Sequence, residues 1–240
     1  MIRFFVALTV TILLLVSQSA FAITYDVFDP NDATGSANIS SWINNLGGDI
    51  TVHEDFEDIG VTDGANWYDS LSTGIGTFTA ISGLGTGETS NPDGDLKFAV
   101  LDDYNYGRFN TTDSGTNYLD SADVKVITLI LNDSLNLSNL FFYITDASDC
   151  NATTTTGANA DISPYPVSNL SNGNERFVGI SLGAGEGFIE SITWTVSTSS
   201  DGYGLDDFSS VAPVPEPSTI LLLGSGLIGL GWYGRKRRNA

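Results

Sequence analysis

Short runs of apolar residues recur through the middle of the chain, separated by loops rich in Gly, Asn, Asp, Ser and Thr. Most of these runs alternate apolar and polar residues with a period of two, the pattern of a strand with one buried face. The eight runs that we interpret as strands are His53–Ile59, Gly76–Ile81, Leu96–Leu101, Val124–Leu131, Leu140–Thr145, Arg176–Leu182, Phe188–Val196 and Leu205–Val211. Short strands without intervening helices predict an all-β fold, a single antiparallel β-sandwich with a jelly roll as the favoured topology.

Three segments refine this picture. Val124–Leu131 is apolar on both faces, which favours a central strand. The alternation in the seventh run predicts a half-buried strand whose apolar face carries Phe188, Ile192, Trp194 and Val196. Thr153–Thr156 is interpreted as a low-complexity loop. An ice-binding face would need a regular array of threonines, which one loop does not supply.

Residues 23–52 precede the first predicted strand and are polar and rich in turn-forming residues. We interpret them as a polar leader that packs on the domain or is partly mobile. Within the leader, Ile39–Leu46 has only a weak helical pattern. The predicted sandwich domain therefore covers residues 53–211.

The N-terminus has the pattern of an export signal. A short cationic segment, Met1–Arg3, is followed by the apolar run Phe4–Val16 and then by small residues. Ala20 and Ala22 fit the A-x-A cleavage pattern, so residues 1–22 are predicted to be a signal peptide that is removed before Ile23. A retained anchor is the alternative, but the apolar run is short for a membrane span.

Residues 212–240 predict a second membrane element. The run from residue 218 to about 234 contains no charged side chain, and as a helix its first 16 residues span roughly 24 Å, somewhat short of a hydrocarbon core. A buried core helix is the alternative, but it would have to pair four adjacent cations. These cations predict one transmembrane helix with a cytoplasmic C-terminus, and they are Arg235, Lys236, Arg237 and Arg238.

The tail begins with a short motif consisting of Val214, Pro215, Glu216 and Pro217. This motif, the glycine-rich span and the Arg-rich end together resemble the PEP-CTERM sorting signal. The resemblance implies that a membrane-bound sorting enzyme of the exosortase type recognises and cuts the tail. It also implies that the body passes from the inner membrane to the cell surface or the exopolysaccharide matrix of a Gram-negative bacterium. A plain single-span anchor is the alternative that the physical pattern leaves open.

The segment between the two ends is strongly acidic. Arg3 and the four cations of the tail account for five of the 9 Lys+Arg residues, and Glu216 is the only one of the 29 Asp+Glu residues that lies outside the body. The body thus has 28 acidic and 4 basic side chains, a formal charge of −24. Such a surface repels nucleic acid and anionic lipid, which excludes nucleic acid as a partner.

Few residues are available for catalysis. Cys150 is the only cysteine and His53 the only histidine, which excludes an internal disulfide and a zinc site built from Cys or His. A Ser-His-Asp triad would need His53 as its base, and we expect no nucleophile elbow to serve it. Paired carboxylates could hydrolyse glycosides, but so acidic a chain always offers such pairs. We therefore expect a non-enzymatic protein, with a secreted hydrolase as an alternative.

The ends of the body offer a possible metal site. Asp55-Phe56-Glu57, followed by Asn66-Trp67, resembles the first strand of carbohydrate-binding-module-like sandwiches, and the closing Asp201–Phe208 segment resembles the final strand of many PEP-CTERM bodies. The resemblance implies that the first and last strands pair and that a structural calcium lies between them, held by Glu57 and Asp206. Calcium prefers six to eight oxygen ligands, which carboxylates can supply.

Aromatic side chains in predicted loops could stack on sugar rings, and the candidates are Trp67, Tyr104 and Tyr106. The sequence as a whole favours an exported structural or adhesive protein, located at the cell surface or in the extracellular matrix, with exopolysaccharide as an expected partner. A calcium-dependent glycan-binding module is the first alternative to this interpretation.

Overall fold

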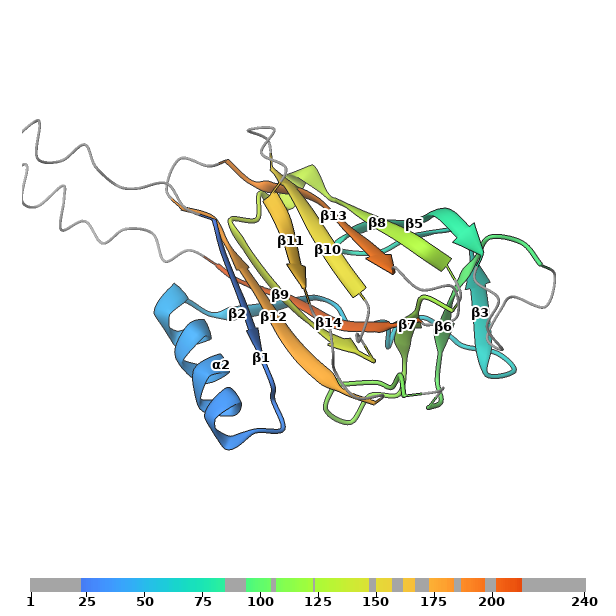
Figure 1. Ribbon diagram of the computed structural model, residues 1–240, viewed down its shortest axis with the longest axis horizontal. Coiled ribbons are helices and arrows are strands. Elements are labelled where there is room, and N and C mark those ends of the chain that lie inside the picture. Colours follow the sequence, from blue (N-terminus) through green and yellow to red (C-terminus); the bar gives the residue numbers. More distant parts are fainter. Residues whose placement is uncertain are drawn as a thin grey trace, which may run out of the picture.

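The computed structural model describes residues 23–84, 94–104, 107–122, 124–146, 150–156, 162–166, 173–183, 187–196 and 202–212. Side chains of residues 84, 150–156 and 162–166 are not part of this description. Within these ranges the chain forms two packed antiparallel sheets with one α-helix on an outer face (Figure 1). The all-β sandwich predicted from the sequence is therefore confirmed. The predicted signal peptide and membrane span lie outside the described residues.

The first sheet contains β1 (Thr24–Phe28), β2 (Ile50–Glu54), β3 (Ala65–Tyr68), β6 (Phe98–Leu101), β7 (Tyr118–Asp120), β9 (Asn139–Thr145), β12 (Glu175–Ser181) and β14 (Gly204–Val211). The second contains β4 (Ser70–Ser72), β5 (Gly76–Leu84), β8 (Val124–Leu131), β10 (Cys150–Thr156), β11 (Ile162–Pro166) and β13 (Ile189–Val196). The helices are α2 (Ala33–Leu46) and the short 3₁₀ helix η1 (Asp133–Leu135).

Eight of these strands form the predicted jelly roll. The order β2-β14-β9-β12 in the first sheet faces the order β8-β13-β10-β11 in the second, and the chain crosses between the sheets from β8 to β9 and from β13 to β14. The remaining strands extend the sheets, with β1 beside β12, β7-β6-β3 beyond β14, and β5-β4 beyond β8. The pairing of β2 with β14 confirms that the first and last predicted strands are neighbours.

Several predicted boundaries were wrong. The first strand does not continue to Ile59, because the chain turns at Phe56, whose φ is +59°. The carboxylates of Glu54 and Asp55 stabilise this turn by accepting the N–H groups of Phe56 and Glu57 at 2.9 and 3.2 Å. Residues 23–52, interpreted as a leader, contain β1, α2 and most of β2.

The threonine segment was also misinterpreted. Thr153–Thr156 is not a loop but the second half of β10, which pairs with β13 from Cys150 opposite Val196 to Thr156 opposite Ile189. A run of β-branched residues favours extended backbone when a neighbouring strand supplies hydrogen bonds. In β13 itself, Phe188 does not join the buried face and is 47% exposed, whereas Ile189 is buried.

The core between the sheets is rich in aromatic side chains. Trp194 is fully buried, as predicted, and its ring centroid lies 5.5 Å from that of Phe142 and 6.1 Å from that of Phe208. Phe56 and Phe78 complete the cluster. Alternate residues of β9, β13 and β14 thus fill one continuous core, as period-two strands should.

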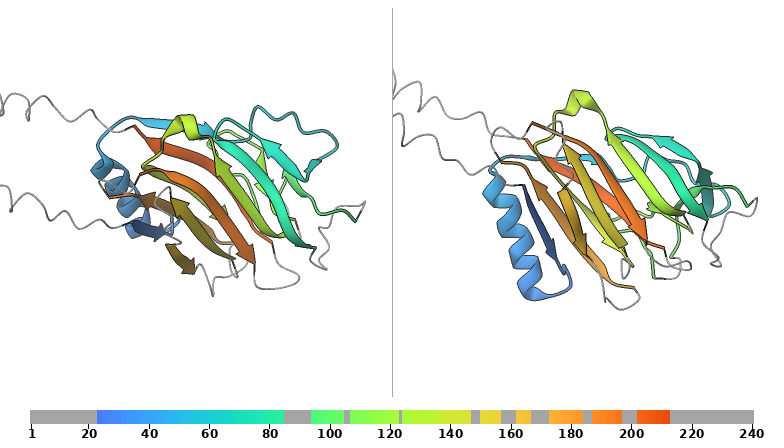
Figure 2. Two further views of the ribbon diagram at one scale, coloured as in Figure 1. Left: turned by 90° about the horizontal axis from the view of Figure 1, so that it is seen from above. Right: turned by 45° about the horizontal axis from the view of Figure 1, so that its top comes forward.

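Helix α2 covers part of the outer face of the first sheet, beside β1 and β12 (Figure 2). Its apolar residues recur at helical spacing and pack on side chains that point outward from the sheet. The cluster comprises the buried Ile39, Phe141, Phe177 and Val211 and the partly buried Phe28, Trp42, Ile43, Leu46 and Tyr143. Trp42 donates its Nε1–H to Asp26 at 2.9 Å. A Cβ on Gly179 would lie 2.6 Å from the Trp42 ring, so only glycine allows this approach.

Candidate functional site

Strand β14 changes partner halfway along its length. Gly204 and Leu205 pair with β7, whereas Phe208 to Val211 pair with β2. Asp206 and Asp207 lie at this break, and Asp207 has a φ of +55°, a left-handed conformation at a register shift. Because Leu205 and Phe208 are both buried in the core, Asp206 faces the outer side of the sheet.

The loop that follows Arg108 covers this break. Asp206 is 1% exposed, and its Oδ2 accepts the N–H groups of Thr111 and Thr112 at 2.7 and 3.1 Å. The two threonine hydroxyls donate to Asp206 and also to Asp207, the shortest of these bonds being 2.8 Å from Thr112 to Asp207. Two adjacent carboxylates therefore hold one end of the loop against the sheet.

Glu57 holds the other end of the same loop. Its Oε1 accepts the N–H groups of Thr116 and Asn117, both at 2.7 Å, and the side-chain amide of Asn110 at 3.0 Å. The side chain of Asn117 in turn donates to the carbonyl groups of Phe56 and Ile59 at 3.0 and 2.9 Å. Glu57 and Asp206, which were predicted from the sequence to hold one calcium ion, thus both accept hydrogen bonds from one loop, residues 110–117.

The electrostatics of this cluster are unfavourable for ionisation. Burial raises the pKa of Asp206 to about 7, and the negative charge of Asp207 adds to the shift, while hydrogen bonds from Thr111 oppose it. Burial also raises the pKa of Asp207, and the carboxylates of Asp55 and Glu57 contribute. The cluster therefore brings together acidic groups from β14 and from the turn after β2.

These residues were predicted to hold calcium. A calcium ion needs six to eight oxygens, but Oδ2 of Asp206 and Oε1 of Glu57 already accept protein N–H groups. In the described part of the chain, no three Asp, Glu, His or Cys side chains are arranged to hold a metal ion. In this arrangement the two residues do not form a coordination shell, and calcium binding at Glu57 and Asp206 stays a prediction.

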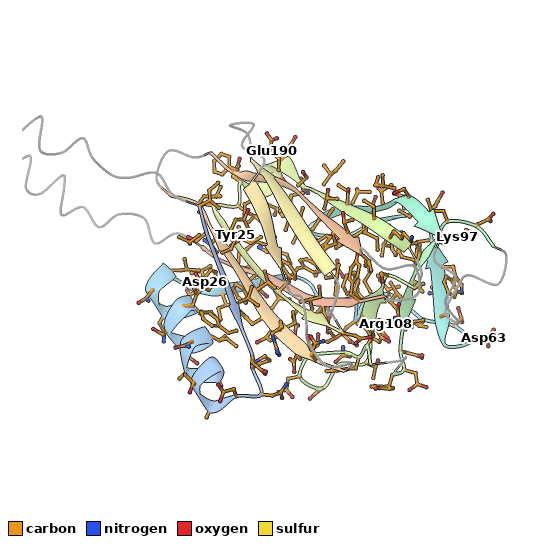
Figure 3. The ribbon with its side chains drawn as sticks, in the orientation of Figure 1. Tyr25, Asp26, Asp63, Lys97, Arg108 and Glu190 are labelled. Carbon is orange, nitrogen blue, oxygen red and sulfur yellow. The ribbon has the colours of Figure 1, made fainter. Side chains whose placement is uncertain are left out.

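A buried ion pair links the start of this loop to the first sheet. The Arg108 guanidinium, labelled in Figure 3, binds Asp120 of β7 at 2.9 Å. Both side chains are almost fully buried. Asp120 also accepts the N–H of Ala122 at 2.6 Å. Because an unpaired buried charge is costly, this pair fixes the start of the loop to the sheet.

A second polar cluster joins β2 and β14. His53 Nε2 lies 2.7 Å from the Ser210 hydroxyl, and the two side chains line a cavity of about 160 Å³ together with Thr51 and Asn139. Burial lowers the pKa of His53, so the ring is neutral at pH 7. Among the described residues, no carboxylate bonds the second ring nitrogen, as an orienting acid would.

The sequence also contains a Gly-x-Ser-x-Gly pattern, contrary to our expectation, at residues 179–183. Ser181 is the last residue of β12 and pairs with Thr24 of β1. A nucleophile elbow requires a sharp turn from a strand into a helix, and the described residues directly after β12 are not helical. The serine of this pattern therefore lies in a paired strand and not at a strand-to-helix turn.

The predicted sugar-stacking residues differ in how far their rings are exposed to solvent. Trp67 is half-buried against Ala99, Leu101 and Tyr118 on the first sheet. Tyr104 is 66% exposed and stacks on Phe109, with 6.4 Å between ring centroids and 11° between ring planes. Tyr106 lies outside the described residues. Only Tyr104 is therefore seen to present a largely exposed ring.

Sequence reasoning missed the threonine partners of the carboxylates and the His53–Ser210 pair. Thr111 and Asp206 are 95 positions apart in the chain, and no local periodicity in the sequence can reveal a contact over that separation. The only available signal was the closing Asp206-Asp207 dipeptide, which marks a strand that cannot bury both side chains.

Comparison with known proteins identifies the tail. The PEP-CTERM protein-sorting motif matches residues 213–238, a range that includes the predicted motif and basic end. This confirms the sorting signal, and it implies export, transient membrane anchoring and processing by an exosortase-type enzyme. No helix among the described residues is long and apolar enough to cross a membrane.

The comparisons say little about the body. No curated protein sequence matches the chain. The crystal structure of the bacteriophage CBA120 tailspike protein 4 enzymatically active domain is similar over 66% of this chain and 20% of that chain, with 12% identity and a TM-score of 0.27. A likeness at that score carries no argument about fold or activity.

Proposed function

We propose that the sandwich is a non-catalytic structural or adhesive module, which its sorting signal delivers to the cell surface or the extracellular polysaccharide matrix. The match of the PEP-CTERM motif to residues 213–238 carries this proposal. The formal charge of −24 on the body supports it, because a highly charged surface stays soluble at the high local concentration of a matrix.

The use of the acidic side chains also supports a non-catalytic body. A glycosidase needs two carboxyl groups that face a substrate, one of them free to donate a proton. In the cluster on β14, the carboxylates of Asp206 and Asp207 instead accept hydrogen bonds from Thr111 and Thr112. Glu57 is likewise occupied by backbone N–H groups. These groups stabilise a loop, and they would have to release it before they could act on a substrate.

The sorting step is tested with the full chain in a Gram-negative host that contains an exosortase. Replacing Pro215, Glu216 and Pro217 together by alanine should leave the tail uncut, so the intact mass would include residues 213–240 and the protein would stay in the membrane fraction. Pro30→Ala, in the body, is the matched control and should be processed normally. Normal processing of the triple variant would contradict the role of the motif.

The competing function is a secreted hydrolase, and the observation that favours it is the 2.7 Å contact between His53 and Ser210 beside a cavity. A nucleophilic serine would react with a fluorophosphonate probe, and the Ser210→Ala variant would not. We expect no labelling of the full chain. Labelling that disappears in Ser210→Ala, but persists in Ser209→Ala, would replace the structural function with a hydrolytic one.

A further inference from the structure

The outer face of the second sheet carries hydroxyl side chains in register across four strands. Backbone pairing aligns Ser70 of β4, Thr79 of β5, Thr128 of β8 and Thr193 of β13 in one row. A second row aligns Ser72, Thr77, Ile130 and Ser191. Residues directly opposite each other in a sheet share a face, so each row presents its side chains together.

The burial pattern shows that this face points to solvent. The intervening residues Phe78, Leu129 and Trp194 are fully buried in the core, whereas Ser70 and Ser72 are exposed and Ile130 is 58% exposed. Neighbouring hydroxyls bond one another, at 2.9 Å between Thr128 and Thr193. The pairs Ser72–Thr77 and Ser70–Thr79 are 3.2 and 3.4 Å apart. Each hydroxyl can donate one bond and accept two, so the rows keep free capacity.

This face is neutral in a protein that is otherwise strongly acidic. Strands β4, β5, β8 and β13 contain one cation, Lys125, and one anion, Glu190, each the second residue of its strand. Glu190 lies at the end of the sheet rather than over its middle (Figure 3). The rows between these two residues carry no charge, although the body as a whole has a formal charge of −24.

A pocket lies at the end of the sheet where β8 stops and β13 begins. It has a volume of about 330 Å³ and is lined by the last residue of β8, by residues that follow β8 and by residues that precede or begin β13, among them Asn132, Asp133, Phe188 and Glu190. Ile130 and Ser191 of the second row are the sequence neighbours of the lining residues Leu131 and Glu190. Phe188 is 47% exposed and offers an aromatic ring next to amide and carboxylate groups, a combination that suits a sugar ring.

We propose that this face and its pocket bind a neutral polysaccharide, with the polymer lying across the hydroxyl rows and one sugar ring stacked on Phe188. The inference rests on the proposed adhesive function and specifies its ligand. Charge selects the class of ligand, because the acidic body repels a polyanion and a polycation would bind the acidic surface elsewhere. A polyhydroxyl polymer matches rows of groups that both donate and accept hydrogen bonds. Many weak contacts along one polymer add up by multivalency.

The test is a pull-down of the full chain in mild detergent on insoluble cellulose, curdlan and cross-linked dextran, with heparin–agarose as a polyanionic probe. We expect the wild type to bind at least one neutral polymer, with and without a calcium chelator, and not to bind heparin. Thr128→Val combined with Thr193→Val keeps the β-branched shape but removes two hydroxyls. This change, and separately Phe188→Ala, should weaken binding about tenfold. Thr24→Val, at an exposed threonine of β1 outside the face, is the matched control.

The outcomes separate the two proposals. If the wild type binds, and the double valine variant and Phe188→Ala bind as well as the wild type, the adhesive function stands and the assignment to this face is wrong. If the wild type binds none of the three neutral polymers, the proposed ligand class is wrong, whereas the sorting experiment still decides the export function. Binding to heparin alone, adsorption to ice crystals alone, or self-association that the valine variant abolishes would each overturn the polysaccharide proposal.

Discussion

The two outer faces of the sandwich have opposite character. On the first sheet, helix α2 covers Phe141, Phe177 and Val211, and loop 110–117 covers Asp206. On the second sheet, rows of serine and threonine face solvent with no described element over them. The difference separates a covered face, which contributes to stability, from a face that is open to solvent. The aromatic side chains on the outer face of the first sheet are packed like core residues. The hydroxyl face of the second sheet contributes little to folding and is available for binding.

The largest effect should come from the covered face. Phe177 is fully buried and its ring centroid lies 5.5 Å from that of Trp42 and 5.4 Å from that of Phe141. Phe177→Ala should lower the free energy of unfolding by about 3–5 kcal/mol, because it leaves a cavity between the helix and the sheet. Ile130→Ala, on the open face, is the matched comparison and should cost less than about 1 kcal/mol.

Urea unfolding followed by tryptophan fluorescence measures both variants. Similar losses for Phe177→Ala and Ile130→Ala would mean that the second sheet is also covered, and the comparison between the faces would fail.

An intermediate effect is expected at loop 110–117, which covers part of the outer face of the first sheet. Glu57→Ala removes an acceptor from Thr116, Asn117 and Asn110, and should cost about 2 kcal/mol in the presence of a chelator, the range for hydrogen bonds to a charged group. Asp58→Ala, an exposed neighbour with the same change of charge, is the control.

The same variant tests the predicted calcium ion. A loss that is clearly larger in calcium than in chelator would support calcium at Glu57 and Asp206, since the ion would then be lost together with its ligand. Equal losses under both conditions would assign Glu57 to the loop alone.

The last prediction concerns pH, and its effect is a change of slope rather than a single loss of stability. The pKa of Asp206 is raised to about 7 in the fold from an ordinary value of 3.8. Between these values the folded chain holds a proton that the unfolded chain releases, so Asp206 makes stability fall as pH rises through this window. Asp206→Asn removes the titration, and the fall should become shallower by at most about 1.4 kcal/mol per pH unit.

Unfolding of both proteins at several pH values between about 4 and 8 measures this difference. Glu54 and Glu175, whose pKa values are also raised, titrate in both proteins and cancel, whereas Asp207 is coupled to Asp206 and its titration changes with the variant. Parallel stability curves for the wild type and Asp206→Asn would show that Asp206 does not hold the extra proton.

The sequence by itself determined the strands that have a clear period and the sorting signal. Val124–Leu131 was predicted with its observed bounds, because apolar residues on both faces indicate a central strand. Trp194 was placed in the core from alternation alone. The tail was identified because its motif, span and cations are contiguous in the chain, so no folding is needed to assemble them.

The tertiary structure decided everything that depends on register and on distant partners. Seven of the 14 residues of helix α2 are Ser, Asn or Gly, which have weak helix propensity, so the helix is stabilised by the packing of Trp42 on the sheet more than by local propensity. Thr111 meets Asp206 only after β14 has changed partners. Thr79, Thr128 and Thr193 belong to three separate strands, and they form one row only because strand pairing sets their register. Local periodicity fixes which side of a strand a residue occupies, but only the pairing of strands fixes which residues become neighbours.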